Sequence, residues 1–579
     1  MKKQLSLVMS FFLLTTGIMA QTGFVITNAT AENVISGNYN PANFNAGLEI
    51  LSSEFPSTVN SQINPDSLKA YIIKLASFKN RNTGSDTLSD SIGIGAARRW
   101  VHGKFESFTA SSPRLIPAYF QFNQRICDIT QHRNIIAVQP GTDTTDKSII
   151  VVEGHIDSRC EGVCDIECDA EGVEDNASGT ALVMELARVM GNYKTKRTIV
   201  YMVTIGEEQG LFGAAAFAEY CEQNNINVRA VFNNDVIGGI ICGKTASPPG
   251  CTGEGDVDST SVRIFSHGAT DSPSKGLARF AKMQYQDDLL PIVSVPMELR
   301  IMSPEDRGGR GGDHIPFRQR GYPAIRYCAA NEHGDASIDA GYVDRQHTES
   351  DVLGVDTDGD LKVDSFFVDF NYLARNGVIN GASAAAAANG PLSPSIQVNK
   401  LENAFEVIIT PAEEAPSYKI GVRAFGHDFH TIYETTKLID TIPRIDTAPQ
   451  HFISACAVDA MGIESLFSNE ERLFTPVGID DARGNIDVPA GIRMEQNRPN
   501  PFDEATYIVF EADSQWEGKD AIITIRDLKG KVVKQLATEV KFGNNEVLYR
   551  HGYGAVGTYL YSLEIEGKSF GVQRMIFAN

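Results

Sequence analysis

Apolar residues recur at two spacings between residues 62 and 388. A helical period begins after Asp66 and places on one face Leu68, Tyr71, Ile72 and Leu75. Four short β-branched runs are apolar enough to be buried strands, at residues 148–154, 198–204, 228–232 and 322–327. Strands that alternate with helical segments predict an α/β domain over residues 62–388.

The pattern changes after residue 388. An alanine run ends at Ala388 and is followed by Gly390, Pro391 and Pro394, which is typical of a helix that passes into a linker. Residues 389–480 carry short runs without long helical stretches, so they predict a small β-sandwich that resembles a fibronectin type III module. Similar alternation predicts a second small β-sandwich over residues 490–579.

The first 61 residues differ from the rest. Residues 1–20 join Lys2 and Lys3 to a short apolar stretch and end at Ala20, which predicts a signal peptide. Residues 21–61 are rich in Asn, Ser and Thr with weak periodicity, so we expect an N-terminal extension, either a propeptide or an irregular segment. No later stretch approaches about 18 apolar residues, so no transmembrane segment is expected in the mature chain.

Charge and cysteine content narrow the class of protein. The chain has 51 Lys and Arg against 73 Asp and Glu, a formal net charge of −22, which argues against nucleic acid as a partner. Nine cysteines in an exported chain make disulfides plausible, with Cys242 and Cys251 as the preferred pair, and the odd total leaves at least one thiol without an intrachain partner. Cys160, Cys164 and Cys168 could bind a metal, but their spacing favours disulfides or loop packing.

Acidic and histidine residues follow the predicted strands. His155 and Asp157 come after the first run, Glu207 and Glu208 after the second, and Asp235 after the third. The carboxyl ends of parallel strands meet at one edge of a sheet, so these side chains are expected to converge. Asp175 before a predicted helix and His347 after the fourth run complete the set.

Each of these residues also has an ordinary interpretation. Asp175 could cap the helix that follows it, and His155 with Asp157 could be a surface pair. Glu207 and Glu208 could be solvated, although adjacent carboxylates at a strand end repel unless a cation or proton intervenes. Their shared order in one α/β domain, with the oxygen and nitrogen ligands that zinc accepts, favours a two-zinc hydrolase site.

The domain resembles the two-zinc exopeptidases, a family that includes bacterial leucyl aminopeptidases and glutamate carboxypeptidase and shares its fold with glutaminyl cyclases. The motifs that carry the resemblance are H-x-D at 155–157, D-N-A-S-G at 175–179, G-E-E-x-G-L-x-G at 206–213, N-x-D at 233–235, and H-T-x-x-D at 347–351, with 312–317 as a further element. The resemblance implies a mixed, mostly parallel central sheet flanked by helices, and an aminopeptidase that hydrolyses peptides.

The same resemblance assigns roles to the site residues. One zinc would take His155 and Asp235, the other Glu208 and His347, and Asp175 would bridge them. Glu207 would be the general base for a water shared by the two Zn²⁺ ions, and Asp157 would orient His155. The chain departs from the commonest pattern between residues 159 and 174, where three cysteines and six acidic residues are inserted. This segment is expected to border the site.

Other functions remain open at this point. A carboxypeptidase would use the same metals, and a glutaminyl cyclase would use one zinc and a tryptophan-lined pocket, although the chain has only Trp100 and Trp516. A non-catalytic surface binding protein is the third alternative. Arg307, Arg310 and His314 could contact the substrate. Residues 356–364 superficially resemble a calcium loop, but Leu361 replaces the required glycine, so calcium is not expected.

The last 90 residues resemble the C-terminal sorting domain that the type IX secretion machinery of certain Gram-negative bacteria reads. The motifs are N-x-P-N-P-F at 497–502, D-x-x-G at 527–530 and G-x-Y at 557–559. The resemblance implies this machinery as a partner, export through the periplasm, and a protein that is secreted or attached to the cell surface.

Overall fold

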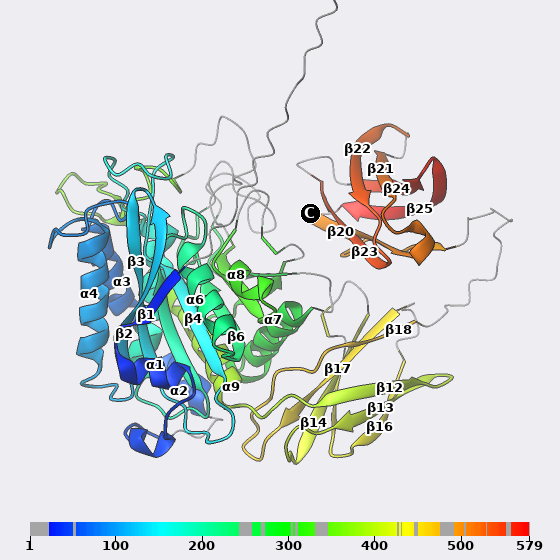
Figure 1. Ribbon diagram of the computed structural model, residues 1–579, viewed down its shortest axis with the longest axis horizontal. Coiled ribbons are helices and arrows are strands. Elements are labelled where there is room, and N and C mark those ends of the chain that lie inside the picture. Colours follow the sequence, from blue (N-terminus) through cyan, green and yellow to red (C-terminus); the bar gives the residue numbers. More distant parts are fainter. Residues whose placement is uncertain are drawn as a thin grey trace, which may run out of the picture.

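The computed structural model describes residues 22–49, 54–241, 257–267, 272–302, 305–306, 311–330, 345–424, 428–429, 431–444, 450–474, 491–502, 505–527, 530–551 and 557–577. An α/β part, coloured blue to green in Figure 1, is followed by two β-sandwiches, one yellow and one orange to red. The predicted signal peptide, the preferred Cys242–Cys251 pair, Arg307 and Arg310 lie outside the described residues.

A nine-stranded mixed sheet forms the centre of the α/β part, in the order β1-β2-β3-β5-β4-β6-β9-β7-β8. Strands β5, β4, β6 and β9 are parallel neighbours at its middle, whereas β1, β2, β3 and β7 join it in antiparallel pairs. The strand bounds are β1 Thr22–Ile26, β2 Ile116–Ile126, β3 Ile129–Gln139, β4 Ile149–His155, β5 Thr198–Thr204, β6 Val228–Asn234, β7 Ser261–Ser266, β8 Glu298–Ile301 and β9 Ala324–Ala329.

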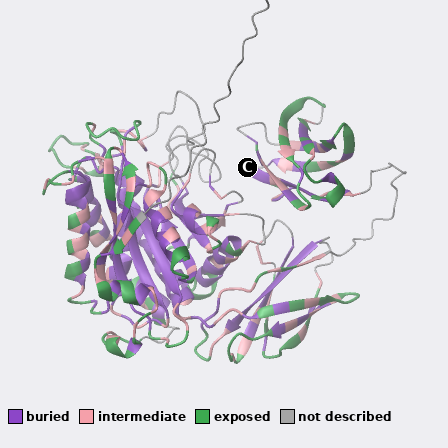
Figure 2. Ribbon diagram, viewed as in Figure 1, coloured by how far each residue is buried: buried purple, intermediate pink, exposed green. Residues whose placement is uncertain are grey.

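Helices cover both faces of this sheet. One face carries α3 (Pro65–Ala76), α4 (Gly93–Phe108), α5 (Ser178–Met190), α7 (Pro273–Gln284) and α9 (Phe370–Asn389). The other carries α1 (Ala29–Ile35), α6 (Phe212–Gln223) and α8 (His314–Gln319). Strands β4 and β5 are therefore buried along their whole length, as the purple central strands of Figure 2 show. Because both faces of these strands are covered, their sequences are continuously apolar rather than alternating. The predicted α/β class and mixed sheet are confirmed.

Short regular elements occur in the described residues 22–49 and 54–62. Strand β1 pairs with β2 at the edge of the large sheet, and Ala31, Val34 and Ile35 of α1 are buried in the main core. Helix α2 (Phe55–Gln62) packs against α9. These elements are short, so the sequence gives each of them only one or two turns of periodicity. Their tertiary contacts, rather than local patterning, hold them in place.

The first β-sandwich consists of a three-stranded sheet, β12-β13-β16, and a four-stranded sheet, β15-β14-β17-β18. Phe405 and Val407 of one sheet share a buried core with Ile420 and Ile453 of the other. The strand bounds are β12 Ser395–Lys400, β13 Ala404–Thr410, β14 Ser417–Ala424, β15 Thr431–Thr435, β16 Ile439–Pro443, β17 Gln450–Val458 and β18 Glu471–Phe474. The small two-stranded sheet of β10 (Gly354–Val355) and β11 (Ser365–Phe366) precedes α9.

The second β-sandwich has the sheets β19-β20-β23 and β22-β21-β24-β25. Phe502 of the N-x-P-N-P-F motif is buried between Tyr549 and Phe577, and Gly530 closes the turn between β21 and β22 by donating its N–H to Asp527 O at 2.9 Å. The strand bounds are β19 Ile492–Met494, β20 Ala505–Ala512, β21 Asp520–Asp527, β22 Val532–Glu539, β23 Gly543–Arg550, β24 Gly557–Ile565 and β25 Lys568–Phe577.

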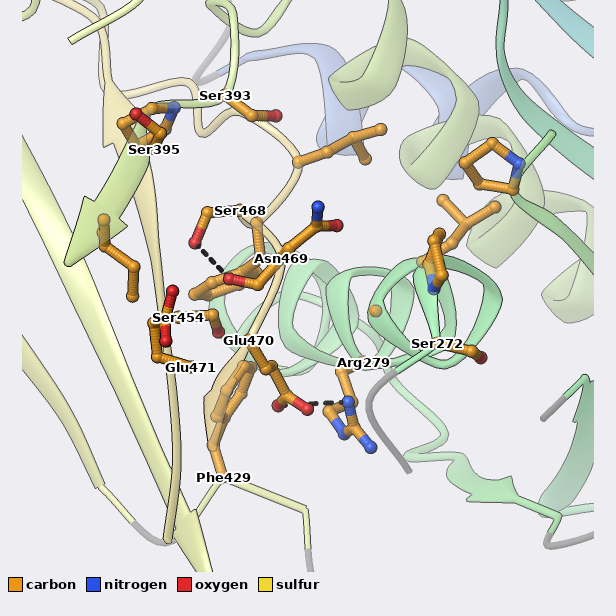
Figure 3. Close-up of a pocket in the computed structure, with 18 residues that line it drawn as sticks. Ser272, Arg279, Ser393, Ser395, Phe429, Ser454, Ser468, Asn469, Glu470 and Glu471 are labelled. Carbon is orange, nitrogen blue, oxygen red and sulfur yellow. Dashed lines mark hydrogen bonds and ion pairs between the residues drawn. The ribbon is translucent and has the colours of Figure 1, made fainter. Parts of the chain in front are cut away.

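Helix α7 of the α/β part contacts the first sandwich through ion pairs. Arg279 of α7 lies 3.3 Å from Glu470, and Arg423 of β14 donates from Nε to the same carboxylate at 2.7 Å. A cavity of about 470 Å³ lies beside this contact, between α7 and the strands of the sandwich (Figure 3). The junction is thus polar and charge-paired.

Two disulfides tie the inserted segment after β4. Cys127, which follows β2, is bonded to Cys164, and Cys160 is bonded to Cys168. This outcome confirms the interpretation of the cysteine cluster as disulfides, while Cys221 and Cys456 are buried thiols. None of the helices in the described part of the chain is long and apolar enough to cross a membrane.

Candidate metal centre

Three parallel strands bring the predicted ligands to one edge of the sheet. His155 is the last residue of β4, Glu207 and Glu208 follow β5, and Asp235 follows β6. Because β5, β4 and β6 are adjacent and parallel, their carboxyl ends lie side by side. The sequence order of the motifs therefore becomes a spatial cluster.

His155 lies at the centre of the first donor group. Its Nε2 is 3.2 Å from Asp235 Oδ1 and 3.2 Å from Asp175 Oδ1, and its side chain is 1% exposed. His155, Glu207 and Asp235 each offer a ligand atom within 4.8 Å of the others. One imidazole and several carboxylates thus face the same small volume.

His347 lies at the centre of the second donor group. Its Nε2 is 2.9 Å from Asp175 Oδ2 and 3.2 Å from Glu208 Oε2. Asp175 therefore directs one oxygen towards each histidine. The structure brings together all of the predicted ligands, His155, Asp175, Glu208, Asp235 and His347.

The segment before α5 holds Asp175 in this position. The Asp351 carboxylate accepts the backbone N–H groups of Glu174 and Asp175 at 2.9 and 3.0 Å, and Gln346 Nε2 donates to Asp175 Oδ2 at 2.5 Å. The ordinary interpretation of Asp175 as a helix cap is wrong, because the Asn176 side chain accepts the Gly179 N–H at 2.8 Å instead. Asp175 is left to the site.

Asp157 supports two parts of the site. Its carboxylate accepts the backbone N–H groups of Glu207 and Glu208 at 3.4 and 3.1 Å, so it shapes the turn that carries both glutamates. Its carbonyl oxygen lies 3.0 Å from His155 Nδ1, whereas the nearer carboxylate oxygen is 3.7 Å away. The backbone rather than the side chain of Asp157 therefore makes the closer contact with the histidine ring.

The pKa values of the two adjacent glutamates are shifted in opposite directions. Burial, followed by the charges of Asp235 and Glu208, raises the pKa of Glu207 well above its usual range despite His155 nearby. Burial also acts on Glu208, but His347 and Arg159 outweigh it and hold its pKa below the usual value. The surroundings of the two glutamates therefore shift their pKa values in opposite directions.

In the two histidines, burial lowers the pKa and the neighbouring carboxylates raise it. Burial alone would lower the pKa of His155, yet Glu207, Asp235 and Asp175 raise it well above the usual value. The pKa of His347 is raised against burial by Glu208 and Asp175, although Arg159 donates to its Nδ1 and so favours a neutral ring. This centre concentrates negative charge around the two imidazoles.

A buried polar layer beneath the centre was missed by sequence reasoning. Asp313, at the N-terminus of α8, accepts a hydrogen bond from the Thr204 hydroxyl, and burial raises its pKa to about 7. Glu153, two residues before His155 on β4, is fully buried, and burial and Asp313 raise its pKa well above its usual range. Residues 312–317 were recognised as a motif, but nothing in their spacing distinguishes Asp313 from a helix cap.

His314 does not join the centre. Its Nε2 lies 3.1 Å from the Glu305 carbonyl oxygen, and the ring is buried on α8. Gln346, Asp351 and Arg159 also reach the site. Asp351 ends the H-T-x-x-D motif, whereas Gln346 and Arg159 belong to none of the recognised motifs.

The donor set fits a metal such as zinc. Two pairs of carboxylates, Glu207 with Asp235 and Asp175 with Glu208, each lie within 4.8 Å of one another and of His155, in a place where like charges are costly unless a cation intervenes. Glu208 Oε1 is buried and has no hydrogen-bond partner among the described residues, as expected of a ligand oxygen. Imidazole and carboxylate donors are ligands that zinc accepts.

The acidic loop at 356–364 differs from this centre. Asp356, Asp358 and Asp360 also approach within 4.8 Å, but they are intermediate or exposed. Asp356 accepts the N–H groups of Gly359 and Leu361 at 2.7 and 2.8 Å. These backbone contacts account for the arrangement of its carboxylate without a cation.

A mixed α/β sheet with a buried histidine–carboxylate centre at its carboxyl edge defines a metal-dependent hydrolase. Residues 134–245 match the model of peptidase family M28. A probable zinc metalloprotease of Leptosphaeria maculans is 32% identical, with 62% of this chain and 83% of that protein covered. One from Pyricularia oryzae is 33% identical, with 64% and 74% covered. The chain belongs to peptidase family M28 and is a zinc-dependent peptidase.

Solved structures with a similar fold include the LapA aminopeptidase of Legionella pneumophila and a Zn-dependent exopeptidase from Parabacteroides distasonis. The first is 20% identical with a TM-score of 0.42, and covers 60% of this chain and 77% of its own. The second is 16% identical with a TM-score of 0.38, and covers 56% and 98%.

Proposed function

We propose that the protein is a secreted two-zinc aminopeptidase. The observation that carries this proposal is the position of Asp175, whose two oxygens lie 3.2 Å from His155 Nε2 and 2.9 Å from His347 Nε2. A carboxylate between two histidines, each with a further carboxylate, suits two metal positions that share one ligand. One position would use His155 and Asp235, the other Glu208 and His347.

Glu207 is the proposed general base. Zinc, when bound, polarises the scissile carbonyl and makes water more acidic. Glu207 then takes the proton of the attacking water and passes it to the departing amine. Burial raises the pKa of Glu207, which makes its carboxylate a stronger base. Asp157 acts as a positioning residue, because it accepts the N–H groups of both glutamates.

Peptides with a free N-terminus are the proposed substrates. Family membership supports peptides in general, and the choice of the amino end is our proposal. The cyclase alternative is less favoured, since Trp100 packs against Tyr71 and Phe78 and Trp516 packs against Phe570, away from the metal centre. Carboxypeptidase action on the same centre is the second candidate.

The second β-sandwich is the proposed sorting domain. We propose a catalytic domain over 62–388, a fibronectin type III-like sandwich over 389–480 and a type IX sorting domain over 490–579, with residues 1–20 removed as a signal peptide. Burial of Phe502 between Tyr549 and Phe577 supports a structural role for the N-x-P-N-P-F motif in this sandwich. The mature protein would be released or attached to the cell surface.

One digestion experiment tests the proposed activity. The zinc-loaded protein is incubated with a peptide whose N-terminus is either free or acetylated, with a chelated sample beside it, and products are followed by mass spectrometry. Stepwise, chelator-sensitive loss of residues from the free N-terminus alone is the expected result. Trimming of both peptides from the C-terminus would make the protein a carboxypeptidase, and intact peptides would overturn the proposed activity.

A further inference from the structure

Arg159 contacts two of the proposed ligands of the second metal position. Its Nε donates to Glu208 Oε2 at 2.7 Å, and its Nη2 lies 2.8 Å from His347 Nδ1. The side chain is 17% exposed, so solvent screens these contacts only weakly. A positive charge thus lies directly against the donor group centred on His347.

The contact with Glu208 involves the oxygen that faces His347. Glu208 Oε2 lies 3.2 Å from His347 Nε2 and 2.7 Å from Arg159 Nε, so the guanidinium and a cation held between Glu208 and His347 would use the same oxygen. A fixed positive charge at this distance also repels a second cation. Both effects weaken metal binding at this position.

The contact with His347 acts in the same direction. A guanidinium only donates hydrogen bonds, so His347 Nδ1 must accept from Arg159. A neutral imidazole that binds a metal through Nε2 carries its hydrogen on Nδ1, which would then face another donor. The Arg159 contact and metal ligation by Nε2 therefore favour different tautomers of the ring.

The first metal position has an arginine in a different arrangement. Arg326 Nε lies 3.2 Å from Asp235 Oδ2, whereas it is Oδ1 of Asp235 that faces His155. Arg326 also lies 2.7 Å from the Asp306 carboxylate, which offsets its charge. Arg326 can thus orient Asp235 without occupying the oxygen that faces the centre.

The disulfide-bonded segment holds Arg159 in place. Its Nη1 donates to the carbonyl oxygens of Cys160 and Glu161 at 3.2 and 3.1 Å. Cys160 is bonded to Cys168, and Cys164 to Cys127 beyond β2. The guanidinium is therefore fixed by its own loop as well as by the ligands.

From these contacts we propose that Arg159 competes with the metal at the Glu208–His347 position, so that the two positions load in sequence, with His155–Asp235 first. This inference rests on the proposed two-metal site. It makes the second metal the weakly bound one, whose occupancy follows the free zinc concentration. The inserted segment that carries Arg159 thereby sets how much metal the enzyme needs.

Calorimetric titration of the chelator-treated full-length protein with Zn²⁺ tests the proposal. In the wild type we expect two steps of different affinity. In Arg159→Gln the weaker step should tighten by about tenfold or more, as expected for loss of a charge-assisted contact, and the tighter step should stay within about twofold. Arg159→Lys keeps the charge and should keep the weak step.

Lys79→Gln is the matched control. Lys79 lies 3.4 Å from Asp169 of the same segment, and its side chain is 59% exposed. The substitution removes one positive charge near the segment, and Lys79 contacts none of the proposed ligands. Both zinc-binding steps should therefore have the same affinities as in the wild type. Thermal unfolding of each variant verifies that it is folded.

The possible failures are distinct. Unchanged or weaker second binding in Arg159→Gln would show that the arginine positions Glu208 rather than competing, and would overturn this inference alone. A wild type that binds no zinc, or only one ion, would overturn the proposed two-zinc function as well.

Discussion

Glu207 and Glu208 are neighbours in the chain with opposite electrostatic environments. Glu207 is buried and has the negative Asp235 near it, and both raise its pKa. Glu208 has His347 and Arg159 beside it, and both lower its pKa. The backbone places them so, because successive side chains after β5 diverge, and Asp157 fixes the turn through both N–H groups. Two identical side chains can thus serve as proton carrier and ligand.

Replacing Glu207 with Gln should separate these roles. We expect kcat to fall by about 10² to 10⁴-fold, because the amide cannot take a proton. The amount of bound zinc should stay as in the wild type. Peptide turnover and metal analysis of the same sample measure both quantities. Glu161→Gln in the exposed inserted segment is the control, and wild-type turnover in Glu207→Gln would remove the assigned base.

The buried carboxyls beneath the centre predict a pH-dependent stability of the chelated protein. Burial raises the pKa of Asp313 to about 7 and that of Asp157 to about 6. Between the unfolded value of about 4 and these values the folded chain holds more protons than the unfolded chain, so its free energy of unfolding falls as pH rises. His155, with its raised pKa, acts in the same direction at higher pH.

We therefore expect the unfolding midpoint of the chelated protein to fall by about 5 °C between pH 5.5 and pH 8. Zinc should reduce this slope, because it compensates the carboxylates. Scanning calorimetry at several pH values measures it. Asp313→Asn, which cannot ionise, should flatten the slope for the chelated sample, and an unchanged slope in that variant would exclude Asp313 as a source.

Among single residues, the sequence predicted the site residues that directly follow a strand. His155, Glu208 and Asp235 could be found because each follows a recognisable apolar run. The contacts of Arg159 and Gln346 could not be predicted, since they depend on how long loops fold back over the sheet edge. The cap at Asn176 was missed because Asp and Asn have similar capping preferences, and only the backbone decides between them.

Among the elements, the inserted segment after β4 differs most from a simple strand-to-helix connection. It runs from Arg159 to Glu174, where the π-helical turn Val173–Ala177 begins, and its cysteines bond both within the segment and to Cys127. The sequence favoured disulfides for the cluster, but the partner Cys127 lies 37 residues from Cys164 in the chain. Their pairing depends on the approach of the β2–β3 turn to the site.

Removing the Cys127–Cys164 bond should loosen this segment more than the sheet. In the double variant Cys127→Ala, Cys164→Ala we expect a loss of about 2 to 4 kcal/mol in the free energy of unfolding. We also expect faster proteolysis within residues 159–171, which mass spectrometry can map. Reductant should reproduce the effect in the wild type. Equal proteolysis of oxidised wild type and variant would show that other contacts hold the segment.

Elements with several turns or fully apolar runs were predictable, and short peripheral ones were not. Helix α3 and strands β4, β5, β6 and β9 lie where the periodicity predicts them. The edge strand β1 and helices α1 and α2 have little periodicity of their own. Strand β1 is stabilised by pairing with β2, α1 by contacts with β2 and β3, and α2 by packing on α9. Secondary structure that depends on tertiary contacts leaves a weak signal in the sequence.

For the whole molecule, charged pairs connect the α/β part with the first sandwich. Lys419 of β14 pairs with Glu464 and lies 3.0 Å from Asp287 of the α/β part, and Lys196 lies 3.2 Å from Asp459. The sequence predicted two separate units with a linker at Gly390 and Pro391. It could not predict this junction, because each partner is an ordinary surface charge until the two parts meet.

Glu470 is the charge at this junction that is best suited to a test. Its side chain is 5% exposed and contacts Arg423, which is fully buried, and Arg279 of α7. Removing one partner of a buried ion pair typically costs about 3 to 5 kcal/mol, because the remaining charge stays buried. In Glu470→Gln the first sandwich should therefore unfold at a lower temperature than the α/β part, as an earlier, separate calorimetric peak. The exposed neighbour Glu471 offers the control Glu471→Gln, which should unfold as the wild type does. A Glu470→Gln profile that matches the wild type would mean that the contacts of Glu470 do not hold the two parts together.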